Sequence, residues 1–338
     1  MKYFILTFGC QANYADSERI SRKLKDAGYT KAKKIEKAGL IVINACSVRQ
    51  SAMDRIYAKI NRITDTGLRY KKIILAGCIL PADKKKLKEK VAEIWHPDEY
   101  FDPPAGGPIY SSKSSAYVPI MTGCNNFCSY CAVPYTRGRE KSRPAKEIIK
   151  EIKKLIKKKY KEIWLLGQNV NSYSSPPVKF PALLKMINDL PGDFQIKFLT
   201  SHPKDMSDEL IKTITKCEKV FKEIHLPLQS GDNTILKRMN RKYTIGHYKN
   251  LIRKIRKYIP EAKISTDIIV GFPNETKKQF ENTAKAMKEM KFFKAYIACY
   301  SPRPGTAAAK LKDNIPRQEK KERRKILVKI LEKQNAQK

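Results

Sequence analysis

The chain has few acidic residues and no long uninterrupted apolar stretch. Its 338 residues include 33 Asp and Glu against 70 Lys and Arg, giving a formal net charge of +37. A membrane-spanning helix would need an apolar run of about 18 residues, and the N-terminus does not read as a signal peptide. We therefore expect a cytoplasmic protein without a membrane partner. The positive charge favours nucleic acid as a partner, although a generally lysine-rich proteome would also explain it.

The chain has eight cysteines, but they do not show the pattern of a disulfide-rich secreted protein. Six of them either follow a strand-like segment or lie in one short loop, a pattern that indicates metal chemistry in a reducing compartment. Cys217 and Cys299 have no metal-like partners nearby in the sequence. We expect both to be packing residues.

The most informative loop places Cys124, Cys128 and Cys131 in a C-x3-C-x2-C pattern. Three thiolates this close can hold three irons of a 4Fe–4S cluster. The fourth iron then has no protein ligand and can bind a small molecule, as an open coordination site does in other metal enzymes. Zinc usually has four protein ligands, and no fourth Cys or His lies nearby in the sequence.

This loop, with Tyr130 before its last cysteine, resembles the cluster loop of radical S-adenosylmethionine (SAM) enzymes. The longer segment GCNNFCSYCAVPYTRGREKSRP resembles the MiaB-like tRNA methylthiotransferases. The resemblance implies that SAM occupies the open iron and is split to a 5′-deoxyadenosyl radical. It thus assigns Cys124, Cys128 and Cys131 to catalysis as well as to metal binding.

Residues 1–98 are expected to form an N-terminal α/β domain. Three short apolar runs, 2–9, 39–45 and 71–77, end at Cys10, Cys46 and Cys78 and alternate with helical patterns at 16–27, 51–63 and 81–94. This alternation predicts a parallel, flavodoxin-like sheet, whose strands have their carboxyl ends at one edge. The three cysteines should meet there. By the resemblance, they hold a second, auxiliary 4Fe–4S cluster, and the segment NACSVR at 44–49 looks like a motif of the same family.

The Pro-, Gly- and Ser-rich residues 99–116 are expected to be a linker, followed by a second α/β domain at 117–312. Alternating strand and helix patterns there predict about six βα units, hence a partial TIM-like barrel with its active site at the carboxyl ends of the strands. Radical SAM enzymes have that fold. Residues 313–338 are expected to form a basic helix that either packs on the barrel or meets RNA. Family members usually continue into an RNA-binding TRAM domain, which we expect to be absent.

Polar residues at the expected strand ends are the candidates for binding SAM. They are Gln168, Asn169, Ser201, Gln229 and Asp267, with Tyr130 near the adenine; the segments around them resemble the family's SAM site. A helix cap or a satisfied loop hydrogen bond would explain any one of them equally well. His202 lies in the same set and is left without a role. The expected RNA-binding residues are Arg137, Arg139, Arg143, Arg241 and Lys242, because guanidinium groups suit phosphates and stacked bases.

The resemblance implies a tRNA methylthiotransferase that converts N6-isopentenyladenosine beside the anticodon into its 2-methylthio derivative. It would use two 4Fe–4S clusters and two SAM molecules per turnover. Its partners would be a tRNA anticodon stem-loop, an electron donor such as flavodoxin or ferredoxin, and a sulfur donor or Fe–S carrier. Two alternatives stay open. One is a sibling enzyme acting on threonylcarbamoyladenosine or on a ribosomal-protein aspartate, and the other is a non-catalytic Fe–S or zinc RNA-binding protein.

Overall fold

The computed structural model describes residues 1–338 except 49, 66–71, 103–105 and 337–338. The chain divides into two compact units. Unit 1 contains 1–125, 131–167 and 303–305, and unit 2 contains 126–130, 168–302 and 306–338. Arg49 of the expected family motif and residues 103–105 of the expected linker lie outside the described part. Among the described residues, no helix is long and apolar enough to cross a bilayer.

Unit 1 begins with a five-stranded sheet in the order β2-β1-β3-β4-β5, with every strand parallel to its neighbour. This is the strand order of the flavodoxin-like fold, as expected. The elements of this part are β1 (Lys2–Thr7), α1 (Gln11–Asp26), β2 (Thr30–Lys31), β3 (Leu40–Cys46), α2 (Gln50–Asp65), β4 (Lys72–Cys78), α3 (Pro81–Leu87) and β5 (Glu93–Ile94).

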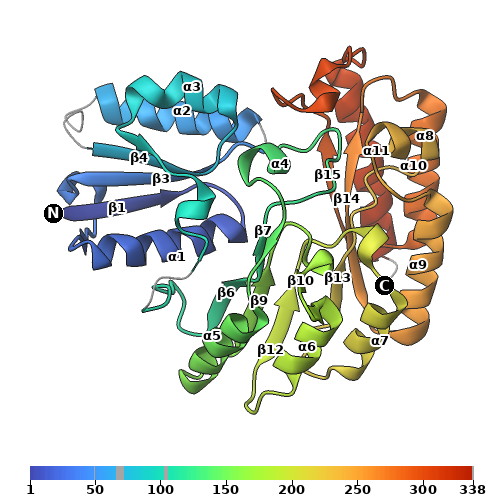
Figure 1. Ribbon diagram of the computed structural model, residues 1–338. Helices are drawn as coiled ribbons and strands as arrows, with labels where there is room; N and C mark the ends of the chain where they lie inside the picture. The colour runs from blue at the N-terminus through green and yellow to red at the C-terminus, as the bar shows by residue number, and fades with distance from the viewer. Residues whose placement is uncertain (49, 66–71, 103–105, 337–338) are drawn as a thin grey trace. The chain divides into compact units, whose positions relative to one another are not determined.

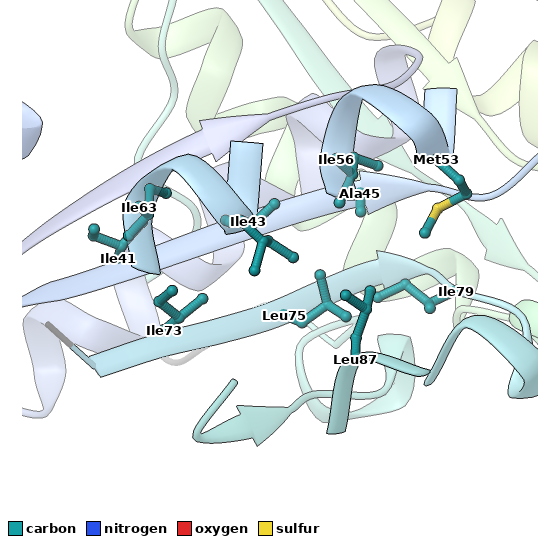
Figure 2. Close-up of a cluster of buried hydrophobic side chains, with 11 residues drawn as sticks. Ile41, Ile43, Ala45, Met53, Ile56, Ile63, Ile73, Leu75, Ile79 and Leu87 are labelled. Carbon is teal, nitrogen blue, oxygen red and sulfur yellow. The ribbon is translucent and has the colours of Figure 1, made fainter. Parts of the chain in front are cut away.

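Helices cover both faces of this sheet, α1 on one side and α2 with α3 on the other (Figure 1). Because β3 is buried on both faces, it reads as a continuous apolar run. Residues Ile41, Ile43 and Leu75 pack against α2 (Figure 2), whereas Leu40 and Val42 face α1. The buried stripe of α2 consists of Met53, Ile56, Ile60 and Ile63.

Two local features differ from the expectation. The helix expected over 81–94 ends at Leu87, because Glu93 and Ile94 instead pair with Ile74 and Leu75 as a fifth strand. Within the expected linker, Tyr100 and Phe101 are buried, and the Tyr100 hydroxyl accepts a hydrogen bond from the backbone of Gly77 at 2.9 Å. This part of the segment therefore packs against the sheet.

The remainder of unit 1 begins the second α/β series. Strand β6 pairs in parallel with β9, and β7 and β8 form a short antiparallel pair whose connection contains the Cys124–Cys131 loop. The bounds are β6 (Ser115–Pro119), β7 (Met121–Thr122), α4 (Val133–Thr136), β8 (Lys141–Ser142), α5 (Ala145–Lys157) and β9 (Glu162–Leu166).

Unit 2 continues the alternation, with β13, β14 and β15 in parallel order and a small hairpin, β10–β11, that the sequence analysis missed. The bounds are β10 (Ser174–Ser175), β11 (Val178–Lys179), α6 (Phe180–Asn188), β12 (Gln195–Phe198), α7 (Asp208–Lys216), β13 (Glu223–His225), α8 (Asn233–Arg238), α9 (Ile245–Tyr258), β14 (Lys263–Val270), α10 (Lys277–Met290), β15 (Lys294–Cys299) and α11 (Arg317–Ala336). Short 3-10 turns connect several of these elements.

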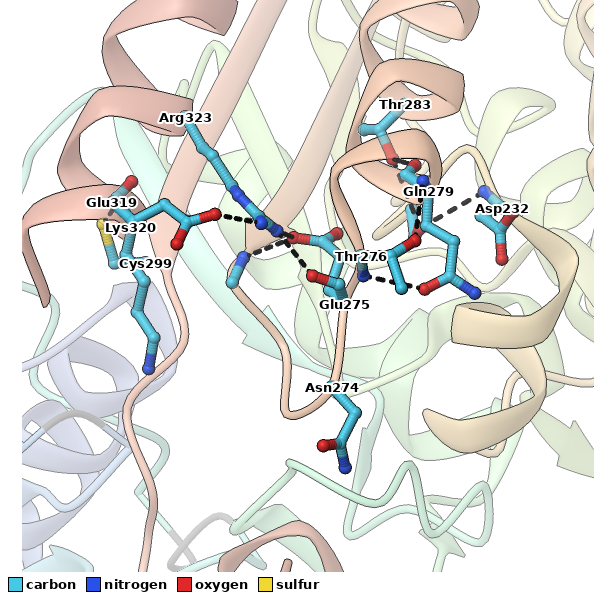
Figure 3. A network of polar contacts seen from close by, with 12 residues as sticks. Asp232, Asn274, Glu275, Thr276, Gln279, Thr283, Cys299, Glu319, Lys320 and Arg323 are labelled. Atoms are coloured by element: carbon cyan, nitrogen blue, oxygen red, sulfur yellow. Dashed lines mark hydrogen bonds and ion pairs between the residues drawn. The ribbon is translucent and has the colours of Figure 1, made fainter. Parts of the chain in front are cut away.

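The basic C-terminal helix α11 packs within unit 2. Leu327 is fully buried, and the Arg323 guanidinium donates to the Glu275 carboxylate at 2.7 Å (Figure 3). Lys320 is also buried and binds Asp313 at 2.6 Å. The structure thus decides a point that the sequence left open: one face of this helix belongs to the protein core.

Candidate active site

The N-terminal cysteines follow three strands of the unit 1 sheet. Cys46 and Cys78 end β3 and β4 and are directly paired in the strand register, and Cys10 comes shortly after β1. Parallel strands end at the same edge, so the sequence-based expectation that these positions converge agrees with the topology. Cys10 also serves as the N-cap residue of α1.

Two asparagines join the segments that bear Cys10 and Cys46. The Asn13 amide donates to Asn44 Oδ1 at 2.9 Å, and the Asn44 amide donates in return to the Asn13 carbonyl at 2.7 Å. Both side chains are completely buried. Next to Cys78, Gly77 has φ +100°, and a Cβ there would lie 2.3 Å from the Ala45 carbonyl oxygen. Only glycine therefore allows β4 to approach β3 this closely.

The three thiols influence one another. A hydrogen bond from Cys78 lowers the pKa of Cys46 to about 7, and the same hydrogen bond together with burial raises the pKa of Cys78. Burial, and then the proximity of Cys78, raises the pKa of Cys10. Thiols that lie close enough to shift one another's pKa suit a metal or cluster, which replaces their protons when it binds thiolates.

Arg137, expected to bind RNA, is instead buried in this cysteine site. Its Nε lies 2.8 Å from Cys78 Sγ, and its Nη2 lies 2.5 Å from Asp16 Oδ2. The sequence could not indicate these partners, because they are 59 and 121 positions away.

The cluster loop starts with a constrained turn in unit 1. Gly123 has φ +75°, and a Cβ at this position would lie 2.0 Å from the Arg139 carbonyl oxygen. The Cys124 amide then donates to the Gly138 carbonyl at 3.2 Å. These contacts fix the start of the loop against its own end.

The middle of the loop, which belongs to unit 2, is fixed by the end of α8 and the segment that follows it. Ser129 donates from its amide to the Met239 carbonyl at 3.0 Å and from its hydroxyl to the Arg238 carbonyl at 2.8 Å. Arg241 is buried and donates to Cys128 Sγ at 3.4 Å and to the Pro227 carbonyl at 3.0 Å. Arg241, expected to contact RNA, thus has its partners inside the protein, one of them the sulfur of Cys128.

Among the described residues, no three His, Cys, Asp or Glu side chains are arranged to hold a single metal ion. The six cysteine assignments therefore stay predictions. The short spacing of the loop and the strand-end positions of the N-terminal set still fit 4Fe–4S clusters, which need Cys thiolates.

The expected SAM-binding residues include a set of buried polar atoms without partners. Gln168 Oε1, Asn169 Oδ1, Ser201 Oγ and Gln229 Oε1 have no hydrogen-bond partner within the described part of the chain. Such groups are rare in folded proteins, because leaving one unpaired costs free energy. Gln229 has φ +68° and pairs through its backbone with Asp267 and Ile269, which fixes its place beside β14. Together these groups could hold a polar ligand.

His202 belongs to the same set. Its Nδ1 accepts a hydrogen bond from the Lys204 amide at 3.2 Å, and its buried Nε2 has no partner among the described residues. Burial, helped by Arg241 and Lys204, lowers the pKa of His202 to about 2. Because Nδ1 accepts the Lys204 hydrogen bond, a neutral imidazole carries its proton on Nε2 and has that N–H to donate.

Asp267 has a partner that the sequence analysis missed. Its Oδ2 lies 3.3 Å from His225 Nε2, and His225 Nδ1 lies 3.0 Å from Ser265 Oγ. The Tyr296 ring packs edge-on against His225. Alternation along β13 and β14 was the available signal, since His225, Ser265 and Asp267 face the same side of the sheet. Tyr130 and Ile269 pack against an apolar cluster that includes Phe272 and Tyr300.

The other three residues expected to bind RNA differ in their exposure to solvent. Arg143 is buried, donating to the Pro119 carbonyl and to Glu151 at 2.7 Å each, so its role is internal. Arg139 and Lys242 are exposed. Three of the five expected RNA residues, Arg137, Arg143 and Arg241, thus have partners inside the protein, a correction to the sequence-based reading. Cys217 is buried and Cys299 partly so, as expected for packing residues.

The comparisons with known proteins cover both units. The family "Radical SAM superfamily" matches residues 118–287, and "Uncharacterized protein family UPF0004" matches residues 2–96. A tRNA-2-methylthio-N(6)-dimethylallyladenosine synthase of Clostridium novyi is 44% identical over 352 residues, covering 93% of this chain and 77% of the relative. The corresponding protein of Syntrophomonas wolfei is 42% identical, covering 96% of this chain and 80% of the relative.

The chain belongs to the radical SAM methylthiotransferases. Solved structures agree on the fold of this methylthiotransferase. The methyltransferase TsrM from Kitasatospora setae has a TM-score of 0.65 at 10% identity, covering 91% of this chain and 76% of that protein. The radical SAM enzyme OxsB has a TM-score of 0.60 at 12% identity, covering 98% of this chain and 56% of that protein. The expected fold class, an N-terminal parallel α/β domain followed by a radical SAM domain, is confirmed.

Proposed function

We propose that this methylthiotransferase acts on tRNA and converts N6-isopentenyladenosine (dimethylallyladenosine) into its 2-methylthio derivative. The observation that carries the proposal is the identity of 39–44% to synthases named for this reaction, extending over 93–100% of the chain. That range includes both cysteine sets. The formal charge of +37 suits a polyanionic substrate.

The residues fit the cofactors that this reaction needs. Cys124, Cys128 and Cys131 would hold one 4Fe–4S cluster, and Cys10, Cys46 and Cys78 would hold the second. The unpaired groups of Gln168, Asn169, Ser201 and Gln229, with Asp267, would hold SAM. When bound, the clusters and two molecules of SAM per turnover supply the radical, the methyl group and the sulfur.

The protein's own part is to orient these groups and to keep water away. The Tyr243 hydroxyl donates to the Leu228 carbonyl at 2.8 Å and receives a hydrogen bond from Arg241 at 3.0 Å, which fixes the guanidinium beside Cys128. His202 presents a neutral N–H donor in the same set. A fixed donor orients a ligand at low entropic cost, because it is ordered before the ligand binds.

A tRNA anticodon stem-loop would be the macromolecular partner, since bases of single-stranded loops can be splayed out and stacked. The reaction also needs an electron donor, such as flavodoxin or ferredoxin, and a sulfur donor or Fe–S carrier. These requirements place the enzyme in the reducing cytoplasm.

Nucleoside mass spectrometry tests the proposal. The gene is expressed in a host that lacks its own methylthiotransferase, beside Cys131→Ala as an inactive variant and Cys217→Ala as a matched control. We expect 2-methylthio-isopentenyladenosine with the wild type and with Cys217→Ala only. An unchanged isopentenyladenosine pool, with iron-loaded protein present, would contradict the proposed substrate and favour a sibling substrate. One zinc and no iron per chain would contradict the enzyme itself.

SAM binding is tested separately on the purified protein. Gln229→Ala and Ser201→Ala each remove one of the unpaired buried groups, and Thr215→Ala, at an exposed position of α7, serves as a control outside that set. Equilibrium dialysis of the iron-loaded chain should show weaker SAM binding for the first two variants only. Equal affinity in all four proteins would contradict the assignment of these residues.

A further inference from the structure

Arg137 links the two cysteine segments of unit 1. It lies six positions after Cys131, and between them the short helix α4 packs against β4, the strand that ends at Cys78. The guanidinium Nε is 2.8 Å from Cys78 Sγ, and Nη2 is 2.5 Å from Asp16 Oδ2. The side chains of Arg137 and Asp16 are each only 4% exposed. A buried cation is thus fixed against one sulfur of the N-terminal site.

The position of this cation affects the whole N-terminal set. Cys78 is paired with Cys46 in the strand register, so the guanidinium that contacts the Cys78 sulfur lies beside the N-terminal cysteine set. An arginine remains charged when buried, and its planar fork can bind a carboxylate and a sulfur at the same time. Asp16 therefore orients the guanidinium through Nη2, and the Nε–H donates to Cys78 Sγ.

We propose that Arg137 is a positioning residue that donates a charged hydrogen bond to the Cys78 sulfur and raises the reduction potential of the cluster held there. This inference rests on the proposed second cluster. One-electron reduction adds a negative charge to a cluster, and a hydrogen bond or a cation at a ligand sulfur stabilises that added charge. Arg137 directly follows the loop that would hold the radical cluster. The same segment would therefore supply the group that raises the reduction potential of the auxiliary cluster.

The test measures potential and not only activity. The full-length chain is prepared with Cys124, Cys128 and Cys131 replaced by alanine, so that iron can bind only at the N-terminal cysteines. Into this background we introduce Arg137→Lys, which keeps the charge but loses the fork, and the pair Arg137→Gln with Asp16→Asn, which leaves no buried charge unpaired. Arg139→Gln is the matched control, because Arg139 is an exposed arginine of the same segment.

Iron content and the midpoint potential from a dithionite titration followed by EPR are the readouts. We expect four irons in each protein and a more negative potential for both Arg137 variants, larger for the Gln/Asn pair, with Arg139→Gln unchanged. Loss of iron from the Arg137 variants alone, with an unchanged melting temperature of the apoprotein, would support the same contact. Four irons with an unchanged potential would overturn the inference and leave the second cluster intact. No iron in the starting background would overturn the second cluster itself.

A reciprocal background provides a specificity check. With Cys10, Cys46 and Cys78 replaced by alanine, only the radical cluster remains, and the Gln/Asn pair should leave its potential unchanged. An equal shift in both backgrounds would overturn the inference, because the effect would then be general and not specific to the Cys78 sulfur.

Discussion

At the scale of single residues, burial separates arginines that look alike in the sequence. Arg143 and Arg139 follow the same loop, yet Arg143 is enclosed and paired with Glu151, whereas Arg139 is exposed. Composition identifies both as cations. Only packing identifies which of them is exposed to solvent.

Replacing Arg143 by Gln should destabilise the protein strongly. The change removes the cation that pairs with the buried Glu151 carboxylate. It also removes the 2.7 Å hydrogen bond to the Pro119 carbonyl. Breaking a buried ion pair by removing one partner costs about 3–5 kcal/mol. Urea unfolding of the apoprotein measures the cost, and Arg139→Gln should change the free energy of unfolding by no more than about 0.5 kcal/mol. Equal stability of the two variants would refute the internal role of Arg143.

The Glu151 carboxyl should make stability depend on pH. Burial raises its pKa, but Arg143 and Arg19 outweigh burial, so the pKa lies below the ordinary value of 4.5. A depressed pKa stabilises the folded state above about pH 4.5, and this contribution is lost as the pH falls through the folded-state pKa. The stability difference between wild type and Glu151→Gln should therefore shrink on acidification below pH 4.5. The exposed Glu147→Gln on the same helix should give a curve parallel to the wild type.

At the scale of elements, contacts between distant segments decide the edges of the fold. The sequence around the short strand β5 continues a helical pattern. The strand forms instead because Val91 and Ile94 pack against the apolar cluster that contains Leu75 of β4. Contacts with distant segments also decide how helix α11 packs, because its many charged residues leave it only a weak apolar face. Its docking depends on buried charges that find partners in another segment.

Arg323 is the residue on which that docking should depend most. Its guanidinium binds both the carboxylate and the carbonyl of Glu275, and Glu275 in turn accepts from the Gly271 amide (Figure 3). Arg323→Gln would leave a buried carboxylate without its cation and should cost about 3–5 kcal/mol. Lys325→Gln, exposed on the same helix, is the control. Limited proteolysis should cleave α11 faster in Arg323→Gln only, and equal rates would contradict this anchor.

At the scale of the whole molecule, the excess of positive charge should control binding to tRNA. Helix α5 displays lysines on its exposed face, namely Lys146, Lys150, Lys153, Lys154 and Lys157. Cations that neutralise phosphates release counterions, so affinity falls steeply with salt.

Between 50 and 200 mM salt we expect tRNA affinity to fall by about 10³- to 10⁵-fold, as for roughly six to ten phosphate contacts. Filter binding at several salt concentrations measures the slope. Replacing Lys150, Lys153 and Lys157 by Gln should make the slope shallower if α5 takes part, and the exposed Lys277→Gln on α10 is a comparison on another helix. A flat salt response of the wild type would refute the electrostatic account.

The sequence by itself determined the alternation of strands and helices, the parallel arrangement of the first sheet and the meeting of Cys10, Cys46 and Cys78 at one edge. These features follow from local periodicity and from the rule that parallel strands end together. The tertiary structure alone decided that Arg137 and Arg241 contact cysteine sulfurs, that His225 holds Asp267, and that α11 packs inward. The physical reason is that burial and charge pairing depend on which distant segments come into contact. The type of a residue does not indicate which distant residue will be its partner.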